Sequence, residues 1–138
     1  DESRPLLSWS FTFETGHPVM DAQHMELLAL LNRFDNSLRP GQVGESARHA
    51  MKALIDYVRT HFSYEEQLMH ESGYPQAQNH HVEHLRLLET LASYDLQLKT
   101  NPSFDVQHLL LSLHGWLINH ILESDKHLGR FLRANDRV

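Results

Sequence analysis

The chain has 138 residues, of which 41% are hydrophobic, so it is long enough for one soluble domain with a real core. It contains no cysteine, which excludes disulfides and thiolate metal sites and leaves nitrogen and oxygen as the ligands of any metal. A net charge of −6 without any basic run argues against nucleic acid as a partner, and no apolar stretch approaches the roughly 18 residues of a membrane span.

The first 20 residues show no helical period and carry two prolines and a glycine, which predicts an extended N-terminal arm over residues 1–20. We expect its aromatic side chains, Trp9, Phe11 and Phe13, to pack on the body of the domain. Asp21 follows the arm and is predicted to cap the first helix, since aspartate is a favoured N-cap residue.

Apolar residues then recur at helical spacing in four segments. The predicted helices cover approximately residues 21–39, 44–70, 76–98 and 104–132. The breaks between them are Pro40–Gly41, Gly73–Tyr74–Pro75 and Asn101–Pro102. Because the connections are short, neighbouring helices must be antiparallel, so the predicted fold class is all-α: an up-down-up-down four-helix bundle in a single domain, residues 1–138.

Histidine is the compositional outlier, with 12 copies in the chain. Three pairs of metal-binding residue types lie on the predicted helices: His61–Glu65, His80–His84 and His120–Asp125. The members of the first two pairs are four residues apart, so they share one helix face. The members of the third are five apart, about 140° on an ideal α-helix. Either the aspartate side chain reaches round the helix, or the helix is locally distorted.

His24, near the start of the first predicted helix, adds a fifth imidazole. In an antiparallel bundle, positions that are early, late, early and late along successive helices fall at one end of the bundle. The sequence therefore predicts one site with seven ligands, namely His24, His61, Glu65, His80, His84, His120 and Asp125.

Five imidazoles and two carboxylates are too many ligands for one zinc ion and suit two metal ions that share bridging carboxylates. This ligand set favours non-haem iron, with manganese or zinc as competitors. Two carboxylates and one hydroxide would neutralise three of the four charges of two Fe²⁺ ions. One coordination position would stay open for a small ligand.

Other histidines compete with this assignment. His81 lies three residues before His84 and is a rival to His80, and His127 lies on nearly the same helical face as His120. We expect Glu66 to be a surface residue. Solvated or hydrogen-bonding imidazoles are expected at the remaining positions, His17, His49, His70, His108, His114 and His127.

Five separated motifs resemble the bacterial hemerythrin-like domain. They are MDAQH (20–24), HFSYEEQLM (61–69), GYP (73–75), HHVEH (80–84) and HILESD (120–125), and the resemblance runs from Trp9 to Leu132. It implies two non-haem iron ions joined by an oxo or hydroxo bridge, with O₂ as a reversible ligand. It also implies that His80, His84 and His120 hold one iron, that His24 and His61 hold the other, and that Glu65 and Asp125 bridge them.

The resemblance favours a binding domain over an enzyme. The phrase FETGHPVMDAQH (13–24) is similar to hemerythrin-like sensor domains fused to signalling outputs such as diguanylate cyclases, and the chain starts at Asp1 without a methionine. We therefore expect a cytoplasmic O₂ or redox sensor with a possible C-terminal output domain. The alternatives are a stand-alone O₂ carrier or storage protein, a di-iron peroxidase or oxidase, and a zinc-stabilised structural bundle.

Overall fold

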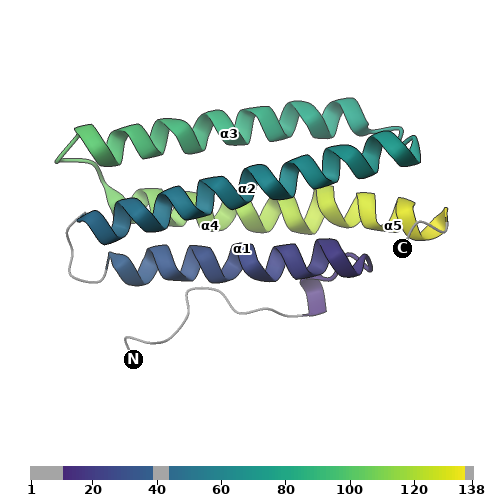
Figure 1. Ribbon diagram of the computed structural model, residues 1–138, viewed down its shortest axis with the longest axis horizontal. Coiled ribbons are helices and arrows are strands. Elements are labelled where there is room, and N and C mark those ends of the chain that lie inside the picture. The colour runs from purple at the N-terminus through teal and green to yellow at the C-terminus, as the bar shows by residue number, and fades with distance from the viewer. Residues whose placement is uncertain (1–10, 39–43, 136–138) are drawn as a thin grey trace.

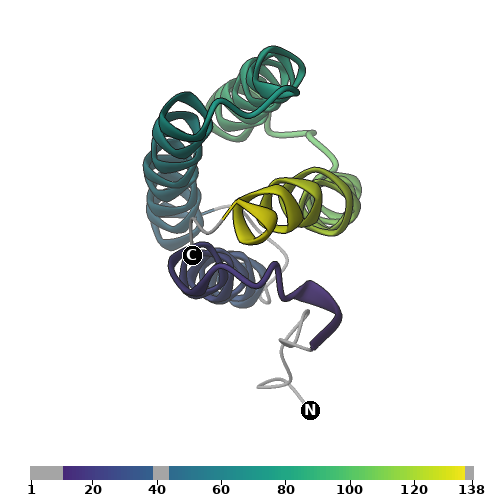
Figure 2. The same ribbon diagram turned by 90° about the vertical axis from the view of Figure 1, so that its right-hand side faces the viewer.

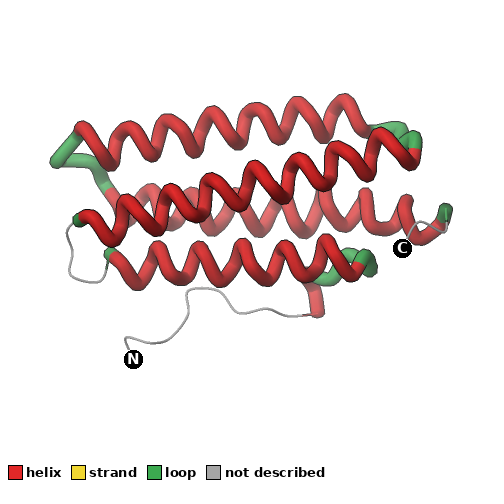
Figure 3. Tube along the Cα trace, viewed as in Figure 1, coloured by secondary structure: helices red, strands yellow, loops and turns green. Residues whose placement is uncertain are grey.

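The computed structural model describes residues 11–38 and 44–135, and within these ranges every regular element is helical. A short 3₁₀-helix, Phe11–Phe13, precedes the bundle. Its rods are α1 (Pro18–Ser37), α2 (Glu45–Ser72), α3 (Ala77–Thr100) and a fourth made of α4 (Val106–Asn119), a π-helix (His120–Asp125) and α5 (Lys126–Ala134). The rods run antiparallel in chain order (Figure 1), surround a common interior when viewed end-on (Figure 2), and contain no strand in the described ranges (Figure 3). The predicted all-α four-helix bundle is confirmed.

The first helix begins earlier than the sequence indicated. Pro18 occupies the first helical position, where a proline loses no helical hydrogen bond. The N-cap is His17, whose Nδ1 accepts from the backbone N–H of Met20 at 3.3 Å. The prediction that Asp21 caps this helix is therefore wrong. Asp21 instead accepts from both the backbone N–H and the Oγ1 of Thr15, each at 2.8 Å, and so ties the preceding segment to α1.

Only part of the predicted N-terminal arm falls within the described residues. Phe13 is buried against the large core, as expected for an arm that packs on the body. Trp9 lies outside the described residues, and so does the Pro40–Gly41 break.

The turn after α2 brings the start of α3 beside the end of α2. Gly73 adopts a left-handed conformation with φ of +67°, and its N–H bonds to the carbonyl of Met69. Glycine suits this position because side chains are strained at positive φ. At the opposite end, Asp105 caps α4 by accepting from the N–H of His108. No helix in the described ranges is both long and apolar enough to span a bilayer.

Two apolar clusters formed by the described residues fill the bundle. The large one runs along most of its length and contains residues from all four rods. The small cluster lies where α1 and α3 begin and consists of Met20, Met69, Tyr74, Leu128 and Leu132. Along α1, His24 is placed between Met20 of the small cluster and Leu27 of the large one. The bundle therefore has a polar layer between two apolar ones.

Candidate metal centre

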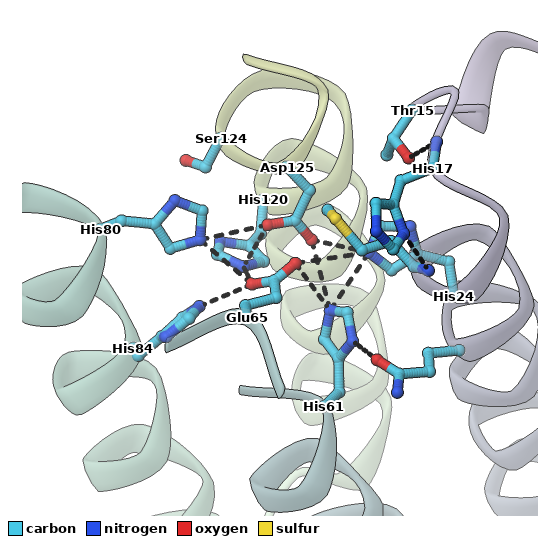
Figure 4. A network of polar contacts seen from close by, with 12 residues as sticks. Thr15, His17, His24, His61, Glu65, His80, His84, His120, Ser124 and Asp125 are labelled. Atoms are coloured by element: carbon cyan, nitrogen blue, oxygen red, sulfur yellow. Dashed lines mark hydrogen bonds and ion pairs between the residues drawn. The ribbon is translucent and has the colours of Figure 1, made fainter. Parts of the chain in front are cut away.

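The seven predicted ligands meet in this polar layer (Figure 4). They come from α1, the end of α2, the start of α3 and the π-helix, so all four rods contribute. Each residue is at most 4% exposed. The sequence predicts that ligands early in the first and third helices and late in the second and fourth meet at one end of the bundle, and the structure places the seven residues in this way.

Three histidines face one side of the two carboxylates. The Nε2 atom of His80 lies 3.1 Å from Glu65 Oε1 and 3.2 Å from Asp125 Oδ1. Nε2 of His84 lies 2.9 Å from Glu65 Oε1, and Nε2 of His120 lies 3.1 Å from Asp125 Oδ1. Three imidazole nitrogens thus converge on one oxygen from each carboxylate. We call this set the three-histidine group.

Two histidines face the other side. Nε2 of His24 lies 2.7 Å from Asp125 Oδ2, and Nε2 of His61 lies 3.1 Å from Glu65 Oε2. The two Nε2 atoms are 3.2 Å apart. We call this set the two-histidine group. Each carboxylate therefore presents one oxygen to each group, which is the arrangement of a bridging ligand.

Metal-binding geometry supports the same division. The three histidines and the two carboxylates form a set of five residues whose ligand atoms, one from each residue, all lie within 4.8 Å of one another. The two histidines and the same two carboxylates form a second set of four that meets the same criterion. Both groups share Glu65 and Asp125. Two neighbouring cations would fit, and the one in the two-histidine group would have fewer protein ligands.

The π-helix resolves the spacing of His120 and Asp125. Residues five apart are about 140° apart on an α-helix, but π-helical hydrogen bonds join residue i to i+5 and so place such residues on one face. The local helix distortion, one of the two alternatives that the sequence left open, is what the structure contains. Both side chains thereby reach the three-histidine group.

Three residues that the sequence reasoning missed or misplaced stand behind the histidines. Gln23 Oε1 lies 2.7 Å from Nδ1 of His61. Glu66 Oε2 lies 2.6 Å from Nδ1 of His84, and Glu83 Oε1 forms a short hydrogen bond with Nδ1 of His120. These oxygens only accept, so each Nδ1 must carry the proton, and each Nε2 keeps its lone pair for the centre.

These outer partners follow a simple rule. Gln23, Glu66 and Glu83 each adjoin a predicted ligand in the sequence, and each supports a histidine on the next rod of the bundle. Adjacency to a ligand was the only signal in the sequence, and it does not identify the partner. Glu66 is also partly buried, with 34% of its side chain exposed, instead of lying on the surface as expected.

The rival histidines lie outside both groups. The side chain of His81 is 44% exposed and bonds through Nδ1 to Glu66 at 2.7 Å. His127 is exposed and forms a short hydrogen bond with the hydroxyl of Tyr74. His17 is a buried hydrogen-bonding cap, and burial lowers its pKa. The other three expected surface positions, His49, His70 and His108, are exposed, whereas His114 is partly buried.

Electrostatics couple the buried groups tightly. Burial alone would raise the pKa of Asp125, but His120 and the other imidazoles hold it well below its ordinary value. Burial acts to lower the pKa of His61 and His80, yet the two carboxylates raise both to about 9. In the metal-free protein, protons between imidazole and carboxylate therefore compensate the buried negative charge, as a cation would.

Several buried polar atoms in the described structure form no hydrogen bond of acceptable geometry, although ion-pair partners lie close to them. Among them are Glu65 Oε2, Asp125 Oδ1 and His120 Nε2, all of which face the interior of the cluster. Buried polar groups without a satisfying hydrogen bond are rare and indicate a missing ion or water. Nitrogen and oxygen donors of this mixture suit iron, so the residues present fit two iron ions.

Comparisons with known proteins agree with this geometry. Residues 15–132 match the family described as the Hemerythrin HHE cation binding domain. The chain is 31% identical to a bacteriohemerythrin of Stenotrophomonas maltophilia (strain R551-3), over 94% of this chain and 89% of that protein. It is 30% identical to a bacteriohemerythrin of Methylococcus capsulatus, over 94% and 98%. A crystal structure of wild-type hemerythrin matches with a TM-score of 0.85 and 29% identity, over 92% and 98%.

Proposed function

The chain belongs to the hemerythrin family, whose domains bind a di-iron centre, and we propose that it binds O₂ reversibly at that centre and acts as an O₂ or redox sensor. The ligand assignment is part of this proposal. One iron would be held by His80, His84 and His120, the other by His24 and His61, with Glu65 and Asp125 as bridges.

The division of the two carboxylates between the two histidine groups carries the proposal. Glu65 and Asp125 each direct one oxygen to each group, and the two-histidine group has one residue fewer. The position for an external ligand would therefore be on that side. Bound iron would supply the coordination position and the electrons for O₂.

The residues themselves favour binding over oxidation chemistry. Di-iron proteins of the ferritin type use four carboxylates, whereas both groups here share the same two. Neutral imidazoles stabilise the diferrous state more than anionic ligands do. Apolar residues one turn from the ligands, such as Leu28 and Leu117, are buried and help to exclude water from the centre.

An absorption experiment tests O₂ binding directly. The iron-loaded protein is reduced without oxygen, O₂ is added, and the sample is then deoxygenated while its spectrum is followed. We expect a stable oxygenated spectrum that reverses. Rapid irreversible conversion to the diferric state would point to redox sensing or turnover. A protein that takes up only zinc and shows no oxo-to-iron charge-transfer band would contradict the proposal and support a structural zinc bundle.

The fourth rod supports the sensor role. Asp125 ends the π-helix, and α5 continues from Lys126 to Ala134 without a turn between them. A ligand-dependent shift of the carboxylate would therefore move α5, toward any C-terminal output such as a diguanylate cyclase. Hydrogen exchange of α5 in the reduced protein, with and without O₂, tests this step. Unchanged exchange would sink the sensor role and leave a carrier or storage protein.

One observation favours an enzyme as the second candidate. A surface pocket of about 330 Å³ reaches His80 and is lined by residues with polar groups, including Tyr74, Glu83 and His127. Such a pocket would admit a polar substrate or supply a proton. It adjoins the three-histidine group, away from the side with fewer ligands, so a di-iron peroxidase or oxidase ranks below O₂ binding.

A further inference from the structure

The outer partners of the two histidine groups differ in charge. Behind the three-histidine group stand two carboxylates, Glu66 on His84 and Glu83 on His120. Behind the two-histidine group stands one neutral amide, Gln23 on His61. The Nδ1 atom of His24 is buried and has no hydrogen-bond partner within the described structure.

We propose that Glu66 and Glu83 are positioning residues that make the three-histidine group the tighter metal position, which fills first and empties last. The inference rests on the proposed ligand assignment. A carboxylate that accepts the Nδ1 proton makes the imidazole a stronger donor at Nε2 and fixes the ring orientation. A neutral amide fixes the orientation but donates less electron density.

Glu83 is well held for this role. Ser124 Oγ donates to both of its oxygens at 2.9 Å, and Ser124 belongs to the same π-helix as His120. Glu83 Oε1 also forms the short hydrogen bond with Nδ1 of His120, so the same carboxylate is held by two residues of the π-helix. Glu83 therefore supports a ligand and also links α3 to the π-helix that presents Asp125.

Glu66 is held from both sides as well. One oxygen accepts from Nδ1 of His84 and the other from Nδ1 of His81, at 2.6 and 2.7 Å. The ring of Phe62 stacks on His84 with the centroids 3.8 Å apart and the planes 9° apart. His84 is thus fixed by a carboxylate at one edge and by an aromatic face.

Stepwise metal binding tests the proposal. Metal-free protein is titrated anaerobically with Co²⁺ in the presence of a competing chelator, and the two binding steps are resolved from the visible absorption. Glu66→Gln and Glu83→Gln each keep an acceptor but remove the charge. We expect each to weaken the first step about 10-fold or more and to leave the second nearly unchanged. Gln23→Glu adds a carboxylate behind His61 and should strengthen the second step.

A matched control for Glu66→Gln removes another carboxylate from α2. Glu71 is exposed on α2 and bonds Gln67 instead of a predicted ligand, so Glu71→Gln should leave both steps unchanged. A spectroscopic readout separates positioning from general structural loss. In the Co²⁺-loaded protein, the shifted Nδ1–H signals of His84 and His120 should exchange faster with solvent when their own carboxylate is replaced.

The outcomes distinguish this inference from the proposed function. If the wild type takes up fewer than two ions per chain, the ligand assignment fails, and this inference fails with it. If the wild type binds two ions but neither charge removal nor Gln23→Glu changes the gap between the steps, only the role of the outer carboxylates is overturned. Gln23→Glu keeps the test decisive even if a glutamine variant folds poorly.

Discussion

The two ends of the bundle are built on different physics. At the far end the interior is apolar, with Met51, Leu91 and Leu109 all fully buried. At the site end the interior consists of five imidazoles and two carboxylates, among them Glu65 and Asp125, which are equally inaccessible. Burial of apolar surface stabilises the first interior outright, whereas buried charges are unfavourable until they are compensated.

This difference predicts which part of the protein depends on metal. The small cluster around Met20 and Leu128 closes the site end, but it has only five buried members among the described residues, far fewer than the large cluster. We therefore expect the helices there to be held together more firmly when a cation replaces the protons that compensate the two carboxylates. Order at the site end should follow metal loading, while the far end should fold on its own packing.

Replacing a ligand should give the largest effect. We expect His84→Ala and His61→Ala each to lower iron content sharply from two ions per chain, because each removes one imidazole from a buried group. Iron is measured by elemental analysis and helix content by circular dichroism. His70→Ala is the control, since His70 is exposed at the end of α2 and lies outside both groups. Full di-iron loading of both ligand variants would refute the assignment.

Metal removal should give the second-largest effect, and it should affect the two ends of the bundle differently. Saturation at 100 times the dissociation constant stabilises a site by about 2.7 kcal/mol, which corresponds to roughly 100-fold slower local opening. We therefore expect the amides of residues 20–24 and of the π-helix to exchange on the order of 100-fold faster without metal. Amides near Leu109 should change far less. Equal acceleration at both ends would show that the two regions form one cooperative unit.

Truncating a core side chain at the far end should affect stability without affecting the metal centre, the opposite of metal removal. Leu109→Ala empties a fully buried position at the far end and should lower the free energy of unfolding by about 2–5 kcal/mol without changing iron content. Leu128→Ala removes the same atoms three residues after Asp125 and should also speed the loss of iron to a chelator. Denaturant melts and chelation rates measure the two effects. Identical chelation rates in both variants would argue against local control of the site by the small cluster.

Features of the fold and the site could be predicted from the sequence when they depend on residues close together in the chain, and could not when they depend on contacts between distant segments. Helical periodicity is local, so the four rods and the convergence of His24 with the later pairs could be predicted from spacing and chain reversal. The π-helix was foreseen only as one alternative, because five-residue spacing says nothing about which distortion accommodates it. The partners of the histidines depend on the neighbouring rod. Glu83, for example, reaches His120 across a gap of 37 residues that the sequence does not encode as a pattern.

The capping error has a similar cause. Asp21 is a favoured N-cap type, but Pro18 can start a helix three residues earlier once His17 supplies the cap. Asp21 was then free to bind Thr15, and this contact holds the segment that closes the site end. Residue preference alone does not choose between two adjacent starts, because the choice depends on where the preceding segment packs.

The smallest effect that we predict comes from two glycines on the fourth rod. A Cβ at Gly129 would lie 2.4 Å from the backbone oxygen of Thr15, whereas a Cβ at Gly115 would meet nothing within 4 Å. Gly129→Ala should therefore destabilise the protein by about 1–3 kcal/mol, because a backbone atom must move. Gly115→Ala should stabilise α4 by roughly 0.5–1 kcal/mol, because alanine restricts the unfolded chain. Thermal melts of the two variants decide the matter. The same sign for both changes would mean that α5 does not pack as closely on the segment before α1 as this contact requires.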